Sequence, residues 1–270
     1  MDKNQLIEGA IVIAKDAAKA IKAIYLAGQY DKEIKSDNTP VTSADLAAHK
    51  IIAEGLAKLS PDIPVLSEED TEIPLSVRSQ WQRYWLVDPL DGTQEFISRS
   101  GDFAVIIALV EKNQPAMGVV YAPMTDVCYY AVKGQGAFKR QADGQTNRIN
   151  STSFKVDKLT GLRLAVSRVQ KTEFLLRHFS PDLKYDLIPL GSAALKSCLI
   201  AEGGADCYMR LGPTGEWDTG ATQCIVEEAG GRIANFELQP LSYNQRESFE
   251  NPNFVVIGEP NLDWQDIIKA

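Results

Sequence analysis

One stretch decides the fold of this chain: Trp85-Leu86-Val87-Asp88-Pro89-Leu90-Asp91-Gly92-Thr93-Gln94-Glu95-Phe96-Ile97. The apolar run from Trp85 to Val87 predicts the end of a buried strand. Asp88-Pro89 predicts its stop, because proline has no N–H to continue a ladder. Gly92 can adopt backbone angles that other residues resist, and Thr93 suits the start of a helical turn. The stretch therefore predicts a strand, a tight turn and a helix start.

This corner suits a bound anion and its counter-cations. Backbone N–H groups at Gly92 and Thr93 would face a phosphate, while Asp88 and Asp91 would hold the cations that neutralise it. Taken alone, each aspartate is explained equally well as a turn former. A buried strand leads up to Asp88, however, and the ends of core elements are where clefts form.

Length and composition indicate an ordinary globular enzyme. The 270 residues are 44% hydrophobic and 24% charged, and no apolar run approaches the roughly 18 residues of a membrane span. We therefore expect a cytoplasmic protein, either free or held peripherally at the cytoplasmic face of the inner membrane. A net charge of −8 argues against binding a nucleic acid polymer but permits a small phosphorylated substrate, because bound Mg²⁺ reverses the local field. The oligomeric state stays open.

Periodicity predicts two halves of different character. Residues 1–150 read as two helices, about 4–26 and 43–59, then a short strand at 63–66 and an antiparallel meander of strands from Phe103 to Lys139. A polar stretch at 141–153 is the candidate boundary. Residues 151–270 alternate strands and helices in the α/β manner, with helices at 172–178, 192–201 and 217–229. We expect an α+β N-terminal half that binds metal and phosphate, and an α/β C-terminal half that binds substrate.

Two further acids suit a metal site. Glu68 follows the strand at 63–66, and Asp218 opens the helix at 217–229, where the helix dipole favours a carboxylate. Together with Asp88 and Asp91 they could hold two or three hard cations such as Mg²⁺. Read singly, Glu68 is a solvated acid and Asp218 a helix-start residue. The four cysteines are scattered, which predicts buried free thiols rather than disulfides or a zinc site.

The combined motifs resemble the inositol monophosphatase superfamily of Mg²⁺-dependent, lithium-sensitive phosphatases. The motifs are Asp88-Pro89-Leu90-Asp91-Gly92-Thr93, Ser67-Glu68-Glu69, Glu216-Trp217-Asp218-Thr219-Gly220-Ala221 and Glu228-Ala229-Gly230-Gly231. Further segments resemble the branch of CysQ-type 3'(2'),5'-bisphosphate nucleotidases more than the inositol phosphatases: Gly191-Ser192, Leu195-Lys196, Cys198-Leu199-Ile200-Ala201-Glu202-Gly203, Arg210-Leu211-Gly212-Pro213-Thr214, Tyr243 and Arg246-Glu247-Ser248-Phe249. The resemblance covers nearly the whole chain.

The resemblance implies a layered αβαβα sandwich with its site between the halves. It implies that Glu68, Asp88 and the Leu90 carbonyl hold one Mg²⁺, and that Asp88, Asp91 and Asp218 hold a second. Thr93, paired with Asp45, is implied to orient and help deprotonate a metal-activated water, with Glu68 also counted among the catalytic residues. By the same resemblance Glu68, Leu90, Asp91, Gly92, Thr93 and Asp218 would contact the substrate.

For the substrate we expect adenosine 3',5'-bisphosphate, hydrolysed to AMP and phosphate in sulfur assimilation or nucleotide recycling, together with the related 3'-phosphoadenylyl sulfate. Ser192, Lys196 and Arg210 are then candidates for the second phosphate, although Lys196 could be a solvated charge and Arg210 a loop brace. Tyr243 and Phe249 are candidates for an adenine surface. An inositol or sugar monophosphatase, which needs neither feature, stays open, as does a non-catalytic nucleotide-binding protein.

Overall fold

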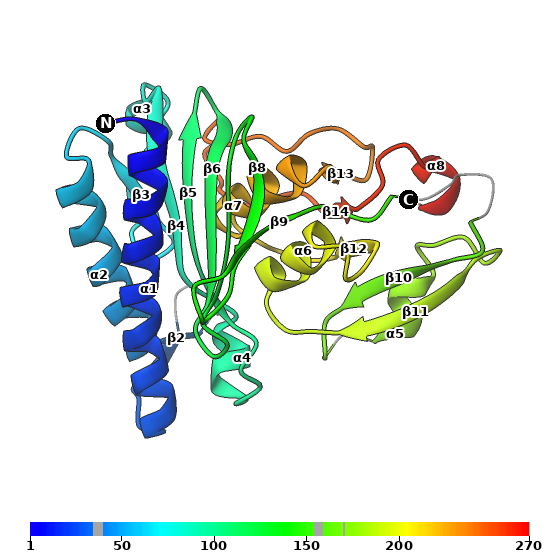
Figure 1. Cartoon of the computed structure of the whole chain (residues 1–270), viewed down its shortest axis with the longest axis horizontal. Coiled ribbons are helices and arrows are strands. Elements are labelled where there is room, and N and C mark those ends of the chain that lie inside the picture. Colours follow the sequence, from blue (N-terminus) through cyan, green and yellow to red (C-terminus); the bar gives the residue numbers. More distant parts are fainter. Residues whose placement is uncertain (35–39, 154–158, 170, 270) are drawn as a thin grey trace.

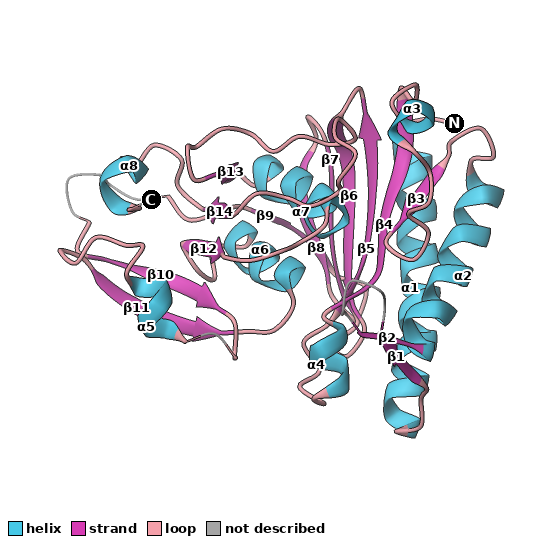
Figure 2. Cartoon of the chain, turned by 180° about the vertical axis from the view of Figure 1, so that it is seen from behind, coloured by secondary structure: helices cyan, strands magenta, loops and turns pink. Residues whose placement is uncertain are grey.

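A computed structural model of the chain describes residues 1–34, 40–153, 159–169 and 171–269. Helices and sheets alternate in five layers (Figures 1 and 2). Helices α1 (Lys3–Ala27) and α2 (Ser43–Leu59) form the first layer and pack on a seven-stranded sheet. Helices α6 (Ala193–Ala201) and α7 (Glu216–Glu228) separate it from a five-stranded sheet, whose outer face carries α5 (Thr172–Leu176) and α8 (Trp264–Ile267). The expected αβαβα sandwich is therefore confirmed.

The seven-stranded sheet follows chain order. Its strands are β3 (Val65–Ser67), β4 (Arg83–Asp91), β5 (Ala104–Glu111), β6 (Gln114–Ala122), β7 (Val127–Val132), β8 (Gly136–Arg140) and β9 (Thr146–Ile149). β3 runs parallel to β4, and every later neighbour is antiparallel, as the predicted meander requires. The shorter pieces outside the sheet are the pair β1 (Lys32–Ile34) and β2 (Pro40–Thr42), and helices α3 (Leu75–Arg78) and α4 (Thr93–Ile97).

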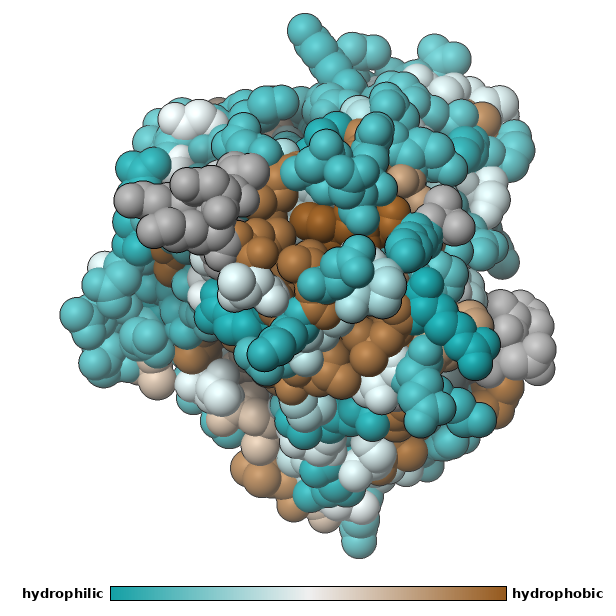
Figure 3. All heavy atoms as spheres, turned by 90° about the vertical axis from the view of Figure 1, so that its right-hand side faces the viewer, coloured by the Kyte–Doolittle hydropathy of each residue, from teal (hydrophilic) through white to brown (hydrophobic). Residues whose placement is uncertain are grey.

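The five-stranded sheet has the order β11-β10-β12-β14-β13. Its strands are β10 (Gly161–Val166), β11 (Lys184–Pro189), β12 (Cys207–Arg210), β13 (Arg232–Asn235) and β14 (Phe254–Ile257). β10 pairs in parallel with β11 and β12, while β14 is antiparallel to its two neighbours. Apolar side chains gather on the end of the molecule seen in Figure 3. Phe174 of α5, a helix of five residues, is 53% exposed.

Strand β4 corrects one sequence-based expectation. The strand does not stop at Asp88-Pro89 but continues to Asp91. Asp88 pairs with Ile106 and Asp91 with Ala104, so three steps along β4 match two along β5. The extra residue is a bulge, where the missing N–H of Pro89 costs no ladder bond. In a regular strand residues three apart point to opposite faces, so the bulge is what lets Asp88 and Asp91 face the same side.

Close packing of α7 on the first sheet places that helix at the bulge. Gly118 of β6 lies so near α7 that a Cβ there would stand 2.2 Å from the Ala221 carbonyl oxygen. Residues of both sheets and of α6 and α7 belong to one apolar core. The division at residue 150 stays a prediction: the first sheet ends with β9, inside the polar stretch 141–153, but the core crosses the boundary.

The cysteines and the ends of two short elements also bear on the sequence-based expectations. The four cysteines are buried free thiols, as expected. Helix α5 ends at Leu176 rather than at His178, and β3 begins two residues later than residue 63. Within the described ranges, no helix combines the length and the apolar character needed to cross a bilayer.

Candidate active site

Three carboxylates meet where the bulge of β4 faces the first turn of α7. Oxygen atoms of Asp88, Asp91 and Asp218 all lie within 4.8 Å of one another. Asp88 and Asp91 are buried, whereas Asp218 is partly exposed. Acids 127 residues or more apart in the sequence are thus brought together by the packing of α7 on β4, β5 and β6.

Helix starts hold two of these carboxylates in place. Asp218 accepts the Gly215 N–H at 2.6 Å at the beginning of α7. Asp91 accepts the Ala194 N–H at 2.8 Å and the Ser192 hydroxyl at the beginning of α6. A helix N-terminus favours negative charge, so both acids are oriented and stabilised by helices of the C-terminal half. The reading of Asp218 as a helix-start residue and its place in the acidic cluster are therefore compatible.

The cluster carries more negative charge than a buried site tolerates alone. Loss of solvent raises the pKa of Asp88 well above its usual value, and the charges of Glu68, Asp91 and Asp218 raise it further. The pKa of Asp218 is raised for the same reasons, by burial first and then by Asp91 and Glu68. Closely spaced oxygen donors with excess negative charge fit a hard divalent cation.

Glu68 and Leu90 border the cluster without belonging to the group of three. Glu68 follows β3, and its N–H donates to the Val87 carbonyl at 3.0 Å. Its side chain is near enough to Asp88 to raise the pKa of the Asp88 carboxyl. The Leu90 N–H donates to Asp88 Oδ1 at 2.9 Å, which fixes the orientation of the Asp88 carboxylate. Both residues line the same pocket as the three aspartates.

Thr93 and Asp45 form the predicted pair. The Thr93 hydroxyl donates to Asp45 Oδ1 at 3.0 Å. Asp45 Oδ2 accepts the Thr42 N–H at 2.8 Å and the Thr42 hydroxyl at 2.6 Å, in a capping box that starts α2. Burial raises the pKa of Asp45. Gly92, at φ 98°, makes the turn from β4 into α4 and so points Thr93 toward Asp45.

A pocket of about 590 Å³ opens over the carboxylates. Lys196 lines it and is only 3% exposed, so it is not the solvated charge of the alternative reading. Its Nζ donates to the Ser192 carbonyl at 2.7 Å, and burial lowers the pKa of Lys196 to about 8. Arg210 also lines the pocket. It braces its own loop through Nη2 and the Pro213 carbonyl at 2.9 Å, while its buried Nε has no hydrogen-bond partner among the described residues.

The aromatic side of the pocket differs from the prediction. Tyr243 is fully buried and its hydroxyl donates to Gln223 Oε1 at 2.7 Å, so it cannot face a ligand. Phe249 does line the pocket, and Trp217 lies beside it with the ring centroids 5.4 Å apart. Sequence reasoning missed Trp217 as a pocket residue, because an aromatic beside Asp218 indicates core equally well.

The Ser192 hydroxyl is engaged within the protein. It donates to Asp91, and the residue adopts a positive φ of 54° to do so. A non-glycine residue with such a φ is uncommon and marks a constrained backbone. In this arrangement Ser192 positions Asp91 and has no hydroxyl proton left for a phosphate, so the predicted phosphate contact stays a prediction.

Comparisons with known proteins find relatives that match nearly the whole chain. The chain is 44% identical over 267 residues to the 3'(2'),5'-bisphosphate nucleotidase CysQ of Aggregatibacter actinomycetemcomitans, covering 99% of this chain and 98% of the relative. It is 42% identical over 252 residues to the same-named protein of Escherichia coli K12, covering 93% and 99%. The crystal structure of CysQ from Bacteroides thetaiotaomicron superposes with a TM-score of 0.80 at 36% identity, covering 96% and 98%.

A more distant solved structure, the suhB protein of Bartonella henselae, gives a TM-score of 0.77 at 27% identity and covers 94% of each chain. The pattern of the inositol monophosphatase family matches residues 2–259. The resemblance drawn from the acidic motifs is confirmed. The chain belongs to the inositol monophosphatase family.

Proposed function

We propose that this chain is a 3'(2'),5'-bisphosphate nucleotidase that hydrolyses adenosine 3',5'-bisphosphate to AMP and phosphate, and that also accepts 3'-phosphoadenylyl sulfate. Relatives of that name match nearly its full length. The observation that carries the proposal is a buried cation, Lys196, in the same pocket as the acidic cluster. A substrate with one phosphate at the aspartates and a second near Lys196 would satisfy both charges.

The site fits a divalent metal, in keeping with a metal-dependent family, and we propose two or three Mg²⁺ ions. Glu68, Asp88 and the Leu90 carbonyl would hold one ion, and Asp88, Asp91 and Asp218 a second. When bound, such cations neutralise phosphate charge and supply hydroxide near neutral pH. The protein's own contribution is to fix these ligands on a strand bulge and on helix starts.

The remaining residues orient the reaction. Asp45 accepts a hydrogen bond from the Thr93 hydroxyl. The lone pairs of the Thr93 oxygen are therefore free to accept a hydrogen bond from the attacking water. Backbone N–H groups of Gly92 and Thr93 would take the scissile phosphate. Positioning and charge neutralisation supply most of the catalysis of phosphoryl transfer, so no covalent intermediate on the protein is required.

The second phosphate is proposed to bind Lys196 and Arg210. Replacing Lys196 with methionine should lower kcat/KM for adenosine 3',5'-bisphosphate by about 10- to 100-fold, the usual range for a charge-assisted hydrogen bond. The loss for adenosine 3'-monophosphate, which lacks the 5'-phosphate, should be much smaller. Steady-state kinetics on both substrates measure the difference.

A pH profile separates the charge of Lys196 from its packing. Its pKa is about 8, and its charged neighbours are Asp91, Glu95, Asp102 and Arg210. Above that pH the ammonium loses its proton, so the preference for the bisphosphate should decline. Lys139→Met, which removes a lysine paired with Glu202 outside the pocket, is the matched control. If Lys196→Met lowered kcat/KM equally for the bisphosphate and for the 3'-monophosphate, Lys196 would not bind the second phosphate.

The substrate itself is tested by phosphate release from adenosine 3',5'-bisphosphate, inositol 1-phosphate and fructose 1,6-bisphosphate, each with Mg²⁺. The proposal expects the nucleotide to have the highest kcat/KM. A preference for inositol 1-phosphate or fructose 1,6-bisphosphate would establish the alternative polyol or sugar phosphatase. Absence of turnover on all three would favour a non-catalytic nucleotide-binding protein.

A further inference from the structure

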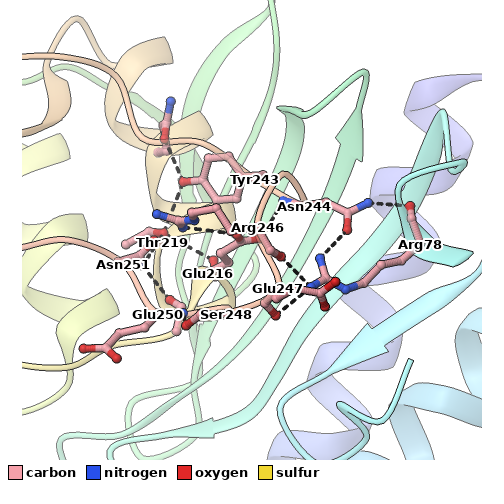
Figure 4. A network of polar contacts seen from close by, with 12 residues as sticks. Arg78, Glu216, Thr219, Tyr243, Asn244, Arg246, Glu247, Ser248, Glu250 and Asn251 are labelled. Carbon is pink, nitrogen blue, oxygen red and sulfur yellow. Dashed lines mark hydrogen bonds and ion pairs between the residues drawn. The ribbon is translucent and has the colours of Figure 1, made fainter. Parts of the chain in front are cut away.

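Arg78 is a fully buried cation that has no part in the proposed chemistry at the three carboxylates. It ends helix α3 and is 1% exposed, whereas an arginine is almost never buried without partners. Its Nη1 donates to Asn244 Oδ1 at 2.7 Å, and Nη2 donates to the carbonyls of Arg246 and Glu247 at 2.6 and 2.8 Å. Nε donates to the Ile73 carbonyl at 3.2 Å. Figure 4 shows Arg78 reaching into this network from one side.

The segment that Arg78 binds is attached at its other side to the start of α7. Asn244 donates its N–H to Glu216 at 2.8 Å, and the Arg246 guanidinium pairs with Glu216 at 3.2 Å (Figure 4). Asn244 also returns a bond to Arg78, from Nδ2 to the Arg78 carbonyl at 2.6 Å. Glu216 is fully buried and directly precedes Trp217. The network therefore connects α3 to α7, the helix that carries the pocket residue Trp217.

The guanidinium of Arg78 also contacts the pocket residue Phe249 directly. Its Cζ lies 4.2 Å from the centre of the Phe249 ring, a cation–π distance. Phe249 packs against Trp217, and both rings line the pocket that holds Asp218. Adjacent aromatic rings that line a pocket provide a surface on which any nucleobase can stack, because every base has a π-face.

We propose that Arg78 is a positioning residue for the base of the substrate: it holds Phe249 and Trp217 as the wall against which the base packs. This inference rests on the proposed nucleotidase function. It assigns the two aromatic rings to base recognition and Arg78 to keeping them in place. Only the planar fork of an arginine can serve two backbone carbonyls, an amide oxygen and a ring face together.

The test compares a substrate with a base to one without. Arg78→Lys keeps the charge but cannot reach all of the acceptors. For adenosine 3',5'-bisphosphate, KM should rise about 5- to 100-fold, the range for loss of a base–aromatic contact, with kcat changed less than threefold. For the abasic deoxyribose 3,5-bisphosphate, kcat/KM should change much less. The nucleotide-to-abasic ratio of kcat/KM is the readout, because a general loss of folded enzyme lowers both values equally.

Two other variants keep the test decisive if Arg78→Lys folds poorly. Asn244→Gly removes the amide that joins Arg78 while suiting the positive φ of 56°, and should lower the same ratio by a smaller factor. Phe249→Leu should lower it as well, and its effect should not add to that of Arg78→Lys. Arg163→Lys is the control: Arg163 makes several bonds, including an ion pair with Asp206 at 2.5 Å, but lies outside the pocket lining.

An unchanged ratio in both Arg78→Lys and Asn244→Gly would overturn the proposal, as would an equal fall of kcat/KM on both substrates. A fall of the ratio in Arg163→Lys would also overturn it, because any lost arginine would then suffice. Failure of the nucleotidase function itself would be seen first and separately: wild-type enzyme would then show no advantage of the nucleotide over the abasic bisphosphate.

Discussion

Asp88→Asn is expected to lower kcat/KM with saturating Mg²⁺ by about 1000-fold or more, because cations at such a site contribute several kcal/mol of transition-state stabilisation. Asp88 is placed to serve both proposed ions, and it stands in the group of three carboxylates whose oxygens lie within 4.8 Å. Asparagine keeps one acceptor oxygen for the Leu90 N–H, so the bulge of β4 should persist. Activity is measured by phosphate release.

The same variant should be more stable than wild type when metal is absent. Burial and like charges raise the folded-state pKa of Asp88 above its unfolded value of 3.8. Above pH 3.8 the folded protein therefore binds more protons, and its stability falls as the pH rises toward the folded pKa. Asparagine cannot ionise, so this cost disappears at neutral pH. For a chain of this size, each kcal/mol recovered raises Tm by about 2–4 °C.

Thermal melts in EDTA and in Mg²⁺ check both effects. Mg²⁺ at 100 times its Kd should stabilise the wild type by about 2.7 kcal/mol, and Asp88→Asn should lose most of this gain. Asp62→Asn, an exposed acid outside the pocket, should resemble wild type in activity and in both melts. A variant less stable than wild type in EDTA would show that the cluster is not strained by its own charge.

Thr93→Val is expected to lower kcat by about 100- to 1000-fold with KM changed little, because loss of a proton-transfer group typically costs about 10²–10⁴ in rate. Valine matches the shape of threonine but cannot donate to Asp45, so the chain from Asp45 to the attacking water is broken. The fold should persist, since Thr93 is only partly buried at the start of a one-turn helix. Steady-state kinetics with Mg²⁺ give kcat and KM separately.

Rescue by a conservative variant distinguishes hydroxyl chemistry from packing. Thr93→Ser restores the hydroxyl and should regain most of the wild-type kcat. The effects of Thr93→Val and Asp45→Asn should not add, because they break the same hydrogen bond. If Thr93→Val retained more than a tenth of the wild-type kcat, the pair would be structural.

The sequence predicted those parts of the fold that local pattern determines. The apolar spacing from Leu6 to Ile21 predicted α1, and a cap at Thr42 or Ser43 predicted the start of α2, because periodicity and capping are local. The bulge in β4 was not predicted. Proline normally ends a strand, and only pairing with β5 reveals that Pro89 lies where the register shifts.

The candidate site was predictable in composition but not in arrangement. The acids were named from their places at strand and helix ends, yet nothing local indicates that Ser192 donates to Asp91 across 101 residues. The surroundings of Tyr243 and Trp217 could not be predicted for a similar reason. Both are aromatic, and only tertiary packing determines that one is bonded to Gln223 in the core while the other lines the pocket.

The proposed catalysis depends most on cations bound between β4 and α7, and a crystal structure with Mn²⁺ and phosphate tests this directly. Mn²⁺ takes the same oxygen ligands as Mg²⁺ and is located by its anomalous scattering. We expect at least two anomalous peaks within coordination distance of the Asp88 carboxylate, one of them also contacting Asp91 and Asp218, with phosphate beside Thr93. Peaks confined to other acids, or an Asp218 side chain turned away from Asp88, would contradict the account.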